Sequence, residues 1–290
     1  MKKLVILLGV AGASLSAVFT RWSTAPALVL ALYRMALSAA IMAVPALTRR
    51  RELAALSRRD VALCLVSGVF LGIHFTAYFA GLERTSIAAA VVLVDTEVLF
   101  VALASAAVLG QRLTGKAWAA VALAFGGSAL VAMSDGGGGG ALLGDLIALS
   151  GAAAMAVYTM IGAVCRRKLS TEVYTFLVYL TASAFLLAAA LVSGTPVTGH
   201  GPVNLLTALG MAVCCTLLGH NVFSWGLKYL PAAYISTAKL LEPVLAAVWG
   251  LLIFKEQPGW LTLLGAAAAM GGLALYIRAS AVPEAERKTT

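Results

Sequence analysis

The stretch GLKYLPAA at residues 226–233 is a divergent copy of GLERTSIA at residues 81–88, and the two copies lie 145 residues apart. Each copy belongs to a unit with an odd number of apolar segments, so the second unit enters a membrane from the opposite side. This pattern predicts an inverted repeat, an architecture typical of secondary transporters with a binding site near the membrane midplane. The same offset aligns further residues in pairs: Glu97 with Glu242, Gln111 with Glu256, and Gly126-Gly127 with Gly271-Gly272.

The composition is that of a membrane protein. Of the 290 residues, 61% are hydrophobic and 11% are charged, and the mean hydropathy is +0.96. A soluble domain of this length cannot bury so much apolar surface, whereas a bilayer accepts it. The alternation typical of barrel strands is absent from the sequence, so helices are predicted for every span. We expect ten transmembrane helices of about 20 residues each, at 3–20, 27–47, 60–80, 86–108, 116–134, 143–165, 172–193, 203–225, 232–254 and 258–278.

The ten segments divide into two groups of five. The predicted fold class is therefore an all-α membrane protein with ten transmembrane helices arranged as two inverted five-helix repeats. The first repeat is expected over residues 1–135 and the second over residues 143–280, joined by a Gly-rich linker at 136–142. Gly136 to Gly140 make this linker flexible. Residues 281–290 are expected to form a cytoplasmic tail.

The positive charges are distributed unevenly among the predicted loops. With the amino terminus inside, sixteen Lys and Arg residues fall on the inner side and only Arg21, Arg84 and Lys255 on the outer side. This bias predicts a multi-pass protein of the inner (plasma) membrane with both termini in the cytoplasm. The basic residues that set the orientation of the protein in the membrane thus account for its net charge of +9, so no nucleic-acid partner is expected. The four cysteines lack metal-ligand spacing, so neither a metal nor a cofactor is expected.

Several stretches are similar to the EamA-type branch of the drug/metabolite transporter superfamily. In the second half they are GLKYLPAA, LEPV at 241–244 and FKE at 254–256, together with the segment from Gly144 to Tyr158. The counterparts in the first half are GLERTSIA, Glu97 and LGQR at 109–112. The resemblance implies a ten-helix carrier without an ATP-hydrolysing part. Members of the family move amino acids, nucleobase-like metabolites or organic cations, mostly outward. The resemblance also implies a central cavity lined mainly by helices 1, 3, 4, 6, 8 and 9.

Two differences between the repeats bear on the expected kinks and charges. Val98 stands where the second repeat has Pro243, so a proline kink is expected only in the ninth helix. Gln111 stands where the second repeat has Glu256, so this position need not be ionised.

Five ionisable residues fall within the predicted spans: Arg34, Asp95, Glu97, Lys239 and Glu242. A charge at the bilayer centre costs about 2.5–3.5 kcal/mol on insertion scales, so such residues pair, face water or stay neutral. Lys239 and Glu242 share a helix face and can pair locally. Asp95 and Glu97 lie about 200° apart around a helix, so only one of them is expected to face the pathway.

The repeat separates these charges into two groups. Glu97 and Glu242 are symmetry mates and, together with Arg34, are interpreted as structural or coupling charges. Asp95 and Lys239 have no charged mates and are the preferred functional pair. Asp95 is expected to contact a substrate ammonium and Lys239 a carboxylate, or the two neutralise one another. Asp95 is also a candidate site of proton coupling.

Polar and aromatic residues on the expected cavity helices complete the predicted substrate site. His74 and Tyr78 share one face of the third segment. Rings beside a few hydrogen-bonding groups suit an amphipathic ligand such as a hydrophobic or aromatic amino acid. The alternative is that the histidines are satisfied inside the bundle. The other candidates lie on the first, sixth and eighth segments: Ser14, Tyr158, His220 and Asn221.

The motifs favour a carrier over other classes of protein. The three histidines do not form an HExxH zinc site and no Gly-x-Ser-x-Gly motif occurs, so an enzyme is not expected. We expect an exporter of small amphipathic metabolites, with amino acids as the favoured class. The alternatives are an organic-cation or nucleobase-type exporter of the same fold, and a channel. The expected partners are a small-molecule substrate and the lipid bilayer, and the sequence is compatible with a monomer.

Overall fold

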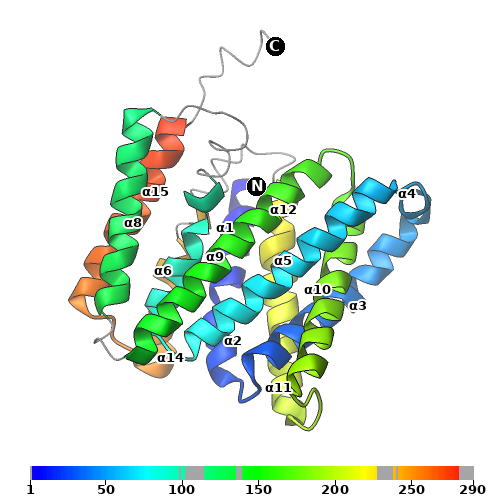
Figure 1. The fold of residues 1–290 in the computed structure, drawn as a ribbon, viewed down its shortest axis with the longest axis horizontal. Coiled ribbons are helices and arrows are strands. Elements are labelled where there is room, and N and C mark those ends of the chain that lie inside the picture. Colours follow the sequence, from blue (N-terminus) through cyan, green and yellow to red (C-terminus); the bar gives the residue numbers. More distant parts are fainter. Residues whose placement is uncertain are drawn as a thin grey trace.

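The structure is a computed structural model that describes residues 2–97, 99–101, 114–134, 139–226, 238–239 and 241–280. Within these ranges all regular structure is helical, as predicted (Figure 1). The elements are α1 (Lys2–Ser14), α2 (Ser16–Trp22), α3 (Ala27–Thr48), α4 (Arg50–Ala54), α5 (Arg58–Leu82), α6 (Ile87–Asp95), α8 (Gly115–Ser134), α9 (Gly139–Cys165), α10 (Thr171–Ser193), α11 (Gly201–Gly210), the π-helix η1 (Met211–His220), α12 (Asn221–Gly226), α14 (Glu242–Phe254) and α15 (Trp260–Ser280).

In the described ranges, six helical segments are long and apolar enough to cross a membrane. They are Leu4–Trp22, Ala27–Thr48, Arg58–Leu82, Ala141–Cys165, Thr171–Ser193 and Gly201–Gly226. Three shorter apolar helices accompany them: Gly115–Val131, Glu242–Phe254 and Trp260–Tyr276. The chain is therefore a multi-pass membrane protein. The predicted fourth and ninth spans include residues 102–108 and 232–237, which lie outside the described part, so the count of ten crossings stays a prediction.

Contacts between loops define two ends of the helix bundle. At one end, Arg21 donates to the carbonyl of Thr85 at 2.9 Å, and the Thr85 hydroxyl donates to Asp145 at 2.7 Å. The first span thus ends where α9 begins. At the opposite end, the amide of Ser170, just after α9, donates to Glu52, just after α3, at 2.6 Å. The first span and α9 therefore run in opposite directions, as Figure 1 also shows.

Two helices are interrupted at positions that the 145-residue offset relates. α6 ends at Asp95 and is followed by a turn at Thr96, and α14 begins directly after a turn at Leu241. The Thr96 hydroxyl donates to the carbonyl of Leu93 at 2.5 Å, and such local bonds compete with the helix ladder. The proline kink expected in the ninth segment thus has a counterpart without a proline in the fourth, at Thr96.

Glycines bring the first and eighth spans into close contact. A Cβ on Gly12 would lie 2.5 Å from the carbonyl oxygen of Cys214, and one on Gly219 would lie 3.2 Å from the Cβ of Ala13. Small residues allow backbones to approach in this way where the hydrophobic effect does not drive helix association. The contact holds the break between α1 and α2, at Leu15, beside the π-helix η1.

α8 and α15 pack against each other on one side of the molecule (Figure 1). A Cβ on Gly127 would lie 2.3 Å from the backbone nitrogen of Ala269, and one on Gly272 would lie 2.5 Å from that of Ala124. Gly127 and Gly272 are symmetry mates, so here the repeat preserves a packing contact.

The domain boundaries stay predictions, with one refinement. α9 begins at Gly139, so the part of the proposed 136–142 linker from Gly139 onward is helical. Residues 135–138 and the proposed tail at 281–290 lie outside the described part of the chain.

Candidate functional site

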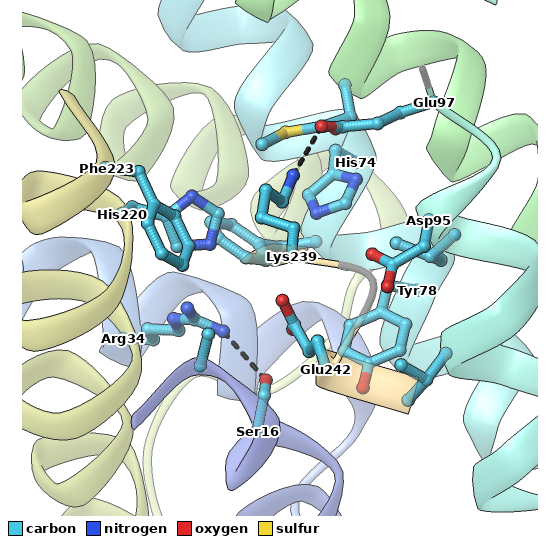
Figure 2. A pocket seen from close by; sticks show the side chains of 15 residues that line it. Ser16, Arg34, His74, Tyr78, Asp95, Glu97, His220, Phe223, Lys239 and Glu242 are labelled. Atoms are coloured by element: carbon cyan, nitrogen blue, oxygen red, sulfur yellow. Dashed lines mark hydrogen bonds and ion pairs between the residues drawn. The ribbon is translucent and has the colours of Figure 1, made fainter. Parts of the chain in front are cut away.

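A buried cavity of about 40 Å³ lies between helices of both predicted repeats (Figure 2). Its volume is well below the roughly 300–1,000 Å³ of typical ligand pockets, so a substrate can be bound there only if the lining helices move apart. The predicted site residues that line it are Arg34, His74, Tyr78, Asp95, Glu97, His220, Lys239 and Glu242. Arg34 comes from α3, a span that the resemblance did not place at the cavity.

Lys239 forms an ion pair with Glu97 across this cavity. Its Nζ atom lies 2.5 Å from Oε1 of Glu97, and the two side chains are 18% and 8% exposed. The direct ion pair of Lys239 is therefore made with Glu97 and not with Asp95. Lys239 and Glu242 form no direct ion pair either, and the ion pair of Lys239 joins it to the other repeat instead.

Asp95 and Glu97 both line the cavity, although helical geometry predicted that only one would face the pathway. The physical reason is the turn at Thr96, which ends α6 between them and removes the 200° relation of a continuous helix. Oδ2 of Asp95 is buried and has no hydrogen-bond partner among the described residues. Neither Asp95 nor Glu242 takes part in any of the ion pairs found in the described ranges.

Arg34 is a buried cation that faces the same cavity. Its Nε donates to the Thr216 hydroxyl at 2.9 Å and one terminal nitrogen donates to the Ser16 hydroxyl at 3.1 Å. The guanidinium also lies over the ring of Phe75, 4.0 Å from its centroid. The residue is 1% exposed, and no ion pair of the described residues includes it. A buried charge without an ion-pair partner is costly, so Arg34 is a candidate to bind an anionic group in the cavity.

Aromatic rings form one wall of the cavity. The His74 ring stacks on Tyr78 with an interplanar angle of 14°, and Phe75 meets His220 edge-on at 5.7 Å between centroids. Nδ1 of His74 lies 2.9 Å from the carbonyl of Gly151. Because a carbonyl only accepts, Nδ1 carries the proton, and Nε2 of a neutral His74 is left as an acceptor. The described residues give the ring nitrogens of His220 no hydrogen bond.

Three predicted site residues do not line the cavity, and each has a packing role. Ser14 accepts a hydrogen bond from Nε1 of Trp249 at 3.0 Å. The ring of Tyr158 stacks on Tyr174 with centroids 6.5 Å apart. Asn221 accepts a hydrogen bond from Tyr179 at 2.7 Å and donates to the sulfur of Met42 at 3.2 Å. The structure thus does not bring Ser14, Tyr158 and Asn221 to the wall of this cavity.

Sequence reasoning missed seven residues of the cavity wall, six of them apolar: Ala13, Ser16, Phe75, Val91, Val94, Met155 and Phe223. Apolar residues carry no signal of a site in a sequence that is 61% hydrophobic. Ser16 was missed in favour of Ser14 because the break at Leu15 alters which side of the segment faces the cavity.

Within the described ranges, no group of three or more His, Cys, Asp or Glu side chains is arranged to hold a metal ion.

Known proteins resemble this chain over most of its length. An uncharacterized transporter of Archaeoglobus fulgidus is 27% identical over 221 residues, 74% of each chain. The pseudopaline exporter CntI of Pseudomonas aeruginosa is 28% identical over 248 residues, which make up 84% of this chain and 83% of the exporter. One crystal structure of a protein with 19% identity aligns with a TM-score of 0.66 over 100% of this chain and 99% of its own, so it shares the fold.

A family model matches the chain twice, once in each half. The model of the EamA-like transporter family matches residues 2–133 and again residues 142–278, which correspond to the two halves recognised by the 145-residue offset. The similarity to EamA-type carriers inferred from the motifs is thereby confirmed, and the chain belongs to the EamA-like transporter family.

Proposed function

We propose that this transporter exports small zwitterionic, amphipathic metabolites, with hydrophobic and aromatic amino acids as the favoured class. The observation that carries the proposal is the pair of opposite charges in one cavity. Arg34 and Asp95 both line it, and neither is ion-paired among the described residues. The pairing of Lys239 with Glu97 leaves Arg34 as the cation for a substrate carboxylate. Asp95, with Glu242, is the acceptor for a substrate ammonium.

The aromatic wall supports the amphipathic part of this proposal. His74, Phe75 and Tyr78 follow one another along α5, and His220 and Phe223 face them from the eighth span (Figure 2). Rings of this kind bind an apolar side chain by burying its surface, while the few polar groups fix its orientation. Export is favoured because one relative is named an exporter.

The proposed mechanism is alternating access by ten transmembrane helices in two inverted five-helix repeats. The opposite directions of the first span and α9 support the inversion. The interruptions at Thr96 and Leu241 supply related points at which helices can bend around the cavity. The excess of Lys and Arg on one set of loops supports an inner-membrane location with cytoplasmic termini.

A flux assay with three related compounds tests this proposal. Proteoliposomes holding the purified chain are given labelled tyrosine, tyramine, which lacks the carboxylate, and 3-(4-hydroxyphenyl)propionate, which lacks the ammonium. We expect saturable exchange of tyrosine, stimulated by substrate on the opposite side, and at least about tenfold weaker transport of either analogue. Voltage-driven unitary currents would contradict a carrier, and equal flux of all three compounds would contradict recognition of a zwitterion.

Organic-cation export is the second candidate, favoured by the balance of charges. The carboxylates of Asp95, Glu97 and Glu242 outnumber the cations Arg34 and Lys239 in the cavity lining. A cationic substrate would restore neutrality there. Transport of tyramine in preference to tyrosine in the same assay would favour this function.

A further inference from the structure

A second hollow, of about 240 Å³, lies where the start of α5 meets the end of α9. It belongs to the end of the bundle at which Ser170 bonds Glu52, away from the loops that hold Asp145. Its lining contains three cations, one carboxylate and an apolar wall: Arg59, Arg167, Lys168, Asp60, Leu63, Val164 and Cys165.

The three cations of this hollow are neutralised only in part by the protein, because they outnumber its single carboxylate, Asp60. Arg59, Arg167 and Lys168 are exposed, and no ion pair or side-chain hydrogen bond among the described residues includes them. Asp60, the carboxylate of the hollow, accepts a hydrogen bond from the Ser57 hydroxyl at 2.6 Å within the cap of α5. The hollow therefore retains an excess of positive charge.

Other acidic groups at this end are already engaged. Glu172 is paired with Arg49 at 3.1 Å, and Glu52 accepts from the amide of Ser170. An anion that settles between Arg59 and Lys168 thus competes with no described protein carboxylate other than Asp60. The excess of cations over carboxylates distinguishes the hollow from the paired surface charges around it.

The floor of the hollow is apolar and continues onto an exposed side of α9. Leu63 and Cys165 line it, and Val164, one residue before the end of α9, is 52% exposed. Charged groups at the end of a span lie at headgroup depth, while the apolar residues beside them lie at the depth of the acyl chains. The ligand that matches both parts carries a phosphate and a hydrocarbon chain.

We propose that this hollow binds an anionic phospholipid of the inner leaflet, with its phosphate between Arg59, Arg167 and Lys168 and an acyl chain along Leu63 and Val164. Basic pockets between spanning helices on the cytoplasmic side recognise lipid headgroups by this chemistry. Because α5 also carries His74 and Tyr78, the bound lipid ties a cavity helix to α9. This site is independent of the substrate that the central cavity takes.

Native mass spectrometry of the full chain tests the assignment. The purified protein is given an equimolar mixture of palmitoyl-oleoyl phosphatidylglycerol and phosphatidylcholine, and the ratio of the two bound lipids is measured. We expect phosphatidylglycerol to be preferred at least about tenfold, and the triple variant Arg59→Gln/Arg167→Gln/Lys168→Gln to bring the ratio near one. The matched triple variant Arg50→Gln/Arg51→Gln/Arg58→Gln removes the same charge from the same end and should retain the preference.

Each other outcome has a defined meaning. No preference in the unaltered protein, or an equal loss in both triple variants, would overturn the site in favour of general surface charge. Displacement of phosphatidylglycerol by inorganic phosphate at millimolar concentration would overturn the lipid assignment in favour of a free anion. If the triple variant does not fold, the double variant Arg167→Gln/Lys168→Gln, confined to the loop after α9, provides the same comparison.

Discussion

The ammonium of Lys239 lies 2.5 Å from a carboxylate oxygen of Glu97, and this ion pair joins the two repeats at the wall of the central cavity. Both side chains are largely buried, so each depends on the other for neutralisation. The pair leaves Arg34, Asp95 and Glu242 as the charges that face the cavity without an ion-pair partner among the described residues.

Removal of one member of this pair should destabilise the protein more than removal of both. Glu97→Gln leaves a buried ammonium unpaired, and we expect a loss of about 3 kcal/mol in the free energy of unfolding. Lys239→Met should have a comparable effect, and the double variant should recover much of the loss. Unfolding in mixed micelles measures the double-mutant cycle. Strictly additive effects would contradict a direct ion pair in the membrane.

Substitution of Arg34 and Asp95 should affect opposite ends of a zwitterionic substrate. Arg34→Gln should weaken tyrosine binding about tenfold or more and leave tyramine unaffected, because only the carboxylate contact is lost. Asp95→Asn should weaken both compounds, since both carry the ammonium. Calorimetric titration measures the affinities, and Arg84→Gln, at an exposed arginine outside the cavity lining, is the matched control. Equal losses for both ligands in Arg34→Gln would contradict its role as the carboxylate site.

Two nearby serines should have separable roles. Ser16→Ala removes an acceptor of the Arg34 guanidinium and should weaken carboxylate binding by a few-fold. Ser14→Ala removes the acceptor of Trp249 and should cost about 1 kcal/mol in stability without changing affinity. Affinity and thermal unfolding are measured on both variants. If Ser14→Ala alters affinity while Ser16→Ala does not, the assignment of the cavity face is reversed.

Glycines at the contact between α8 and α15 should not tolerate a methyl group. Gly127→Ala places Cβ 2.3 Å from the backbone nitrogen of Ala269, and Gly272→Ala makes a similar clash with α8. Backbone atoms cannot give way as a flexible side chain does, so the helices must separate. We expect destabilisation of roughly 1–3 kcal/mol for each variant, measured by thermal unfolding.

The adjacent glycines provide the control for this prediction. A Cβ on Gly126 or Gly271 meets nothing within 4 Å. Alanine has a helix propensity higher than glycine by about 0.5–1 kcal/mol, so Gly126→Ala and Gly271→Ala should be neutral or stabilising. Equal destabilisation by all four substitutions would show that the contact between the helices is not the cause.

The spans and the charges of the site followed from the sequence for a common reason. A membrane core imposes a large energetic difference between apolar and charged residues, so long apolar runs and rare charges are both visible without a structure. Arg34, Asp95, Glu97, Lys239 and Glu242 were all singled out on that basis, and all of them line the cavity.

The roles of these charges did not follow from the sequence. Symmetry between the repeats assigned Glu97 and Glu242 to the scaffold and paired Asp95 with Lys239. In the structure Lys239 pairs with Glu97, and both symmetry-related glutamates face the cavity. Internal symmetry pairs positions in the sequence, whereas an ion pair depends on which side chains of different helices meet, and the turn at Thr96 separates Glu97 from the helix that carries Asp95.

The sequence by itself determined that this protein is a helical membrane protein built from a repeat of 145 residues, because hydrophobicity and internal similarity are properties of the chain alone. Only the tertiary structure decided which charges neutralise one another and which remain for a ligand. That choice depends on contacts between residues far apart in the chain, such as Glu97 with Lys239 and Arg34 with Thr216. Such contacts are set by the breaks at Leu15 and Thr96 and by the close approach of helices at glycines, which no periodic pattern encodes.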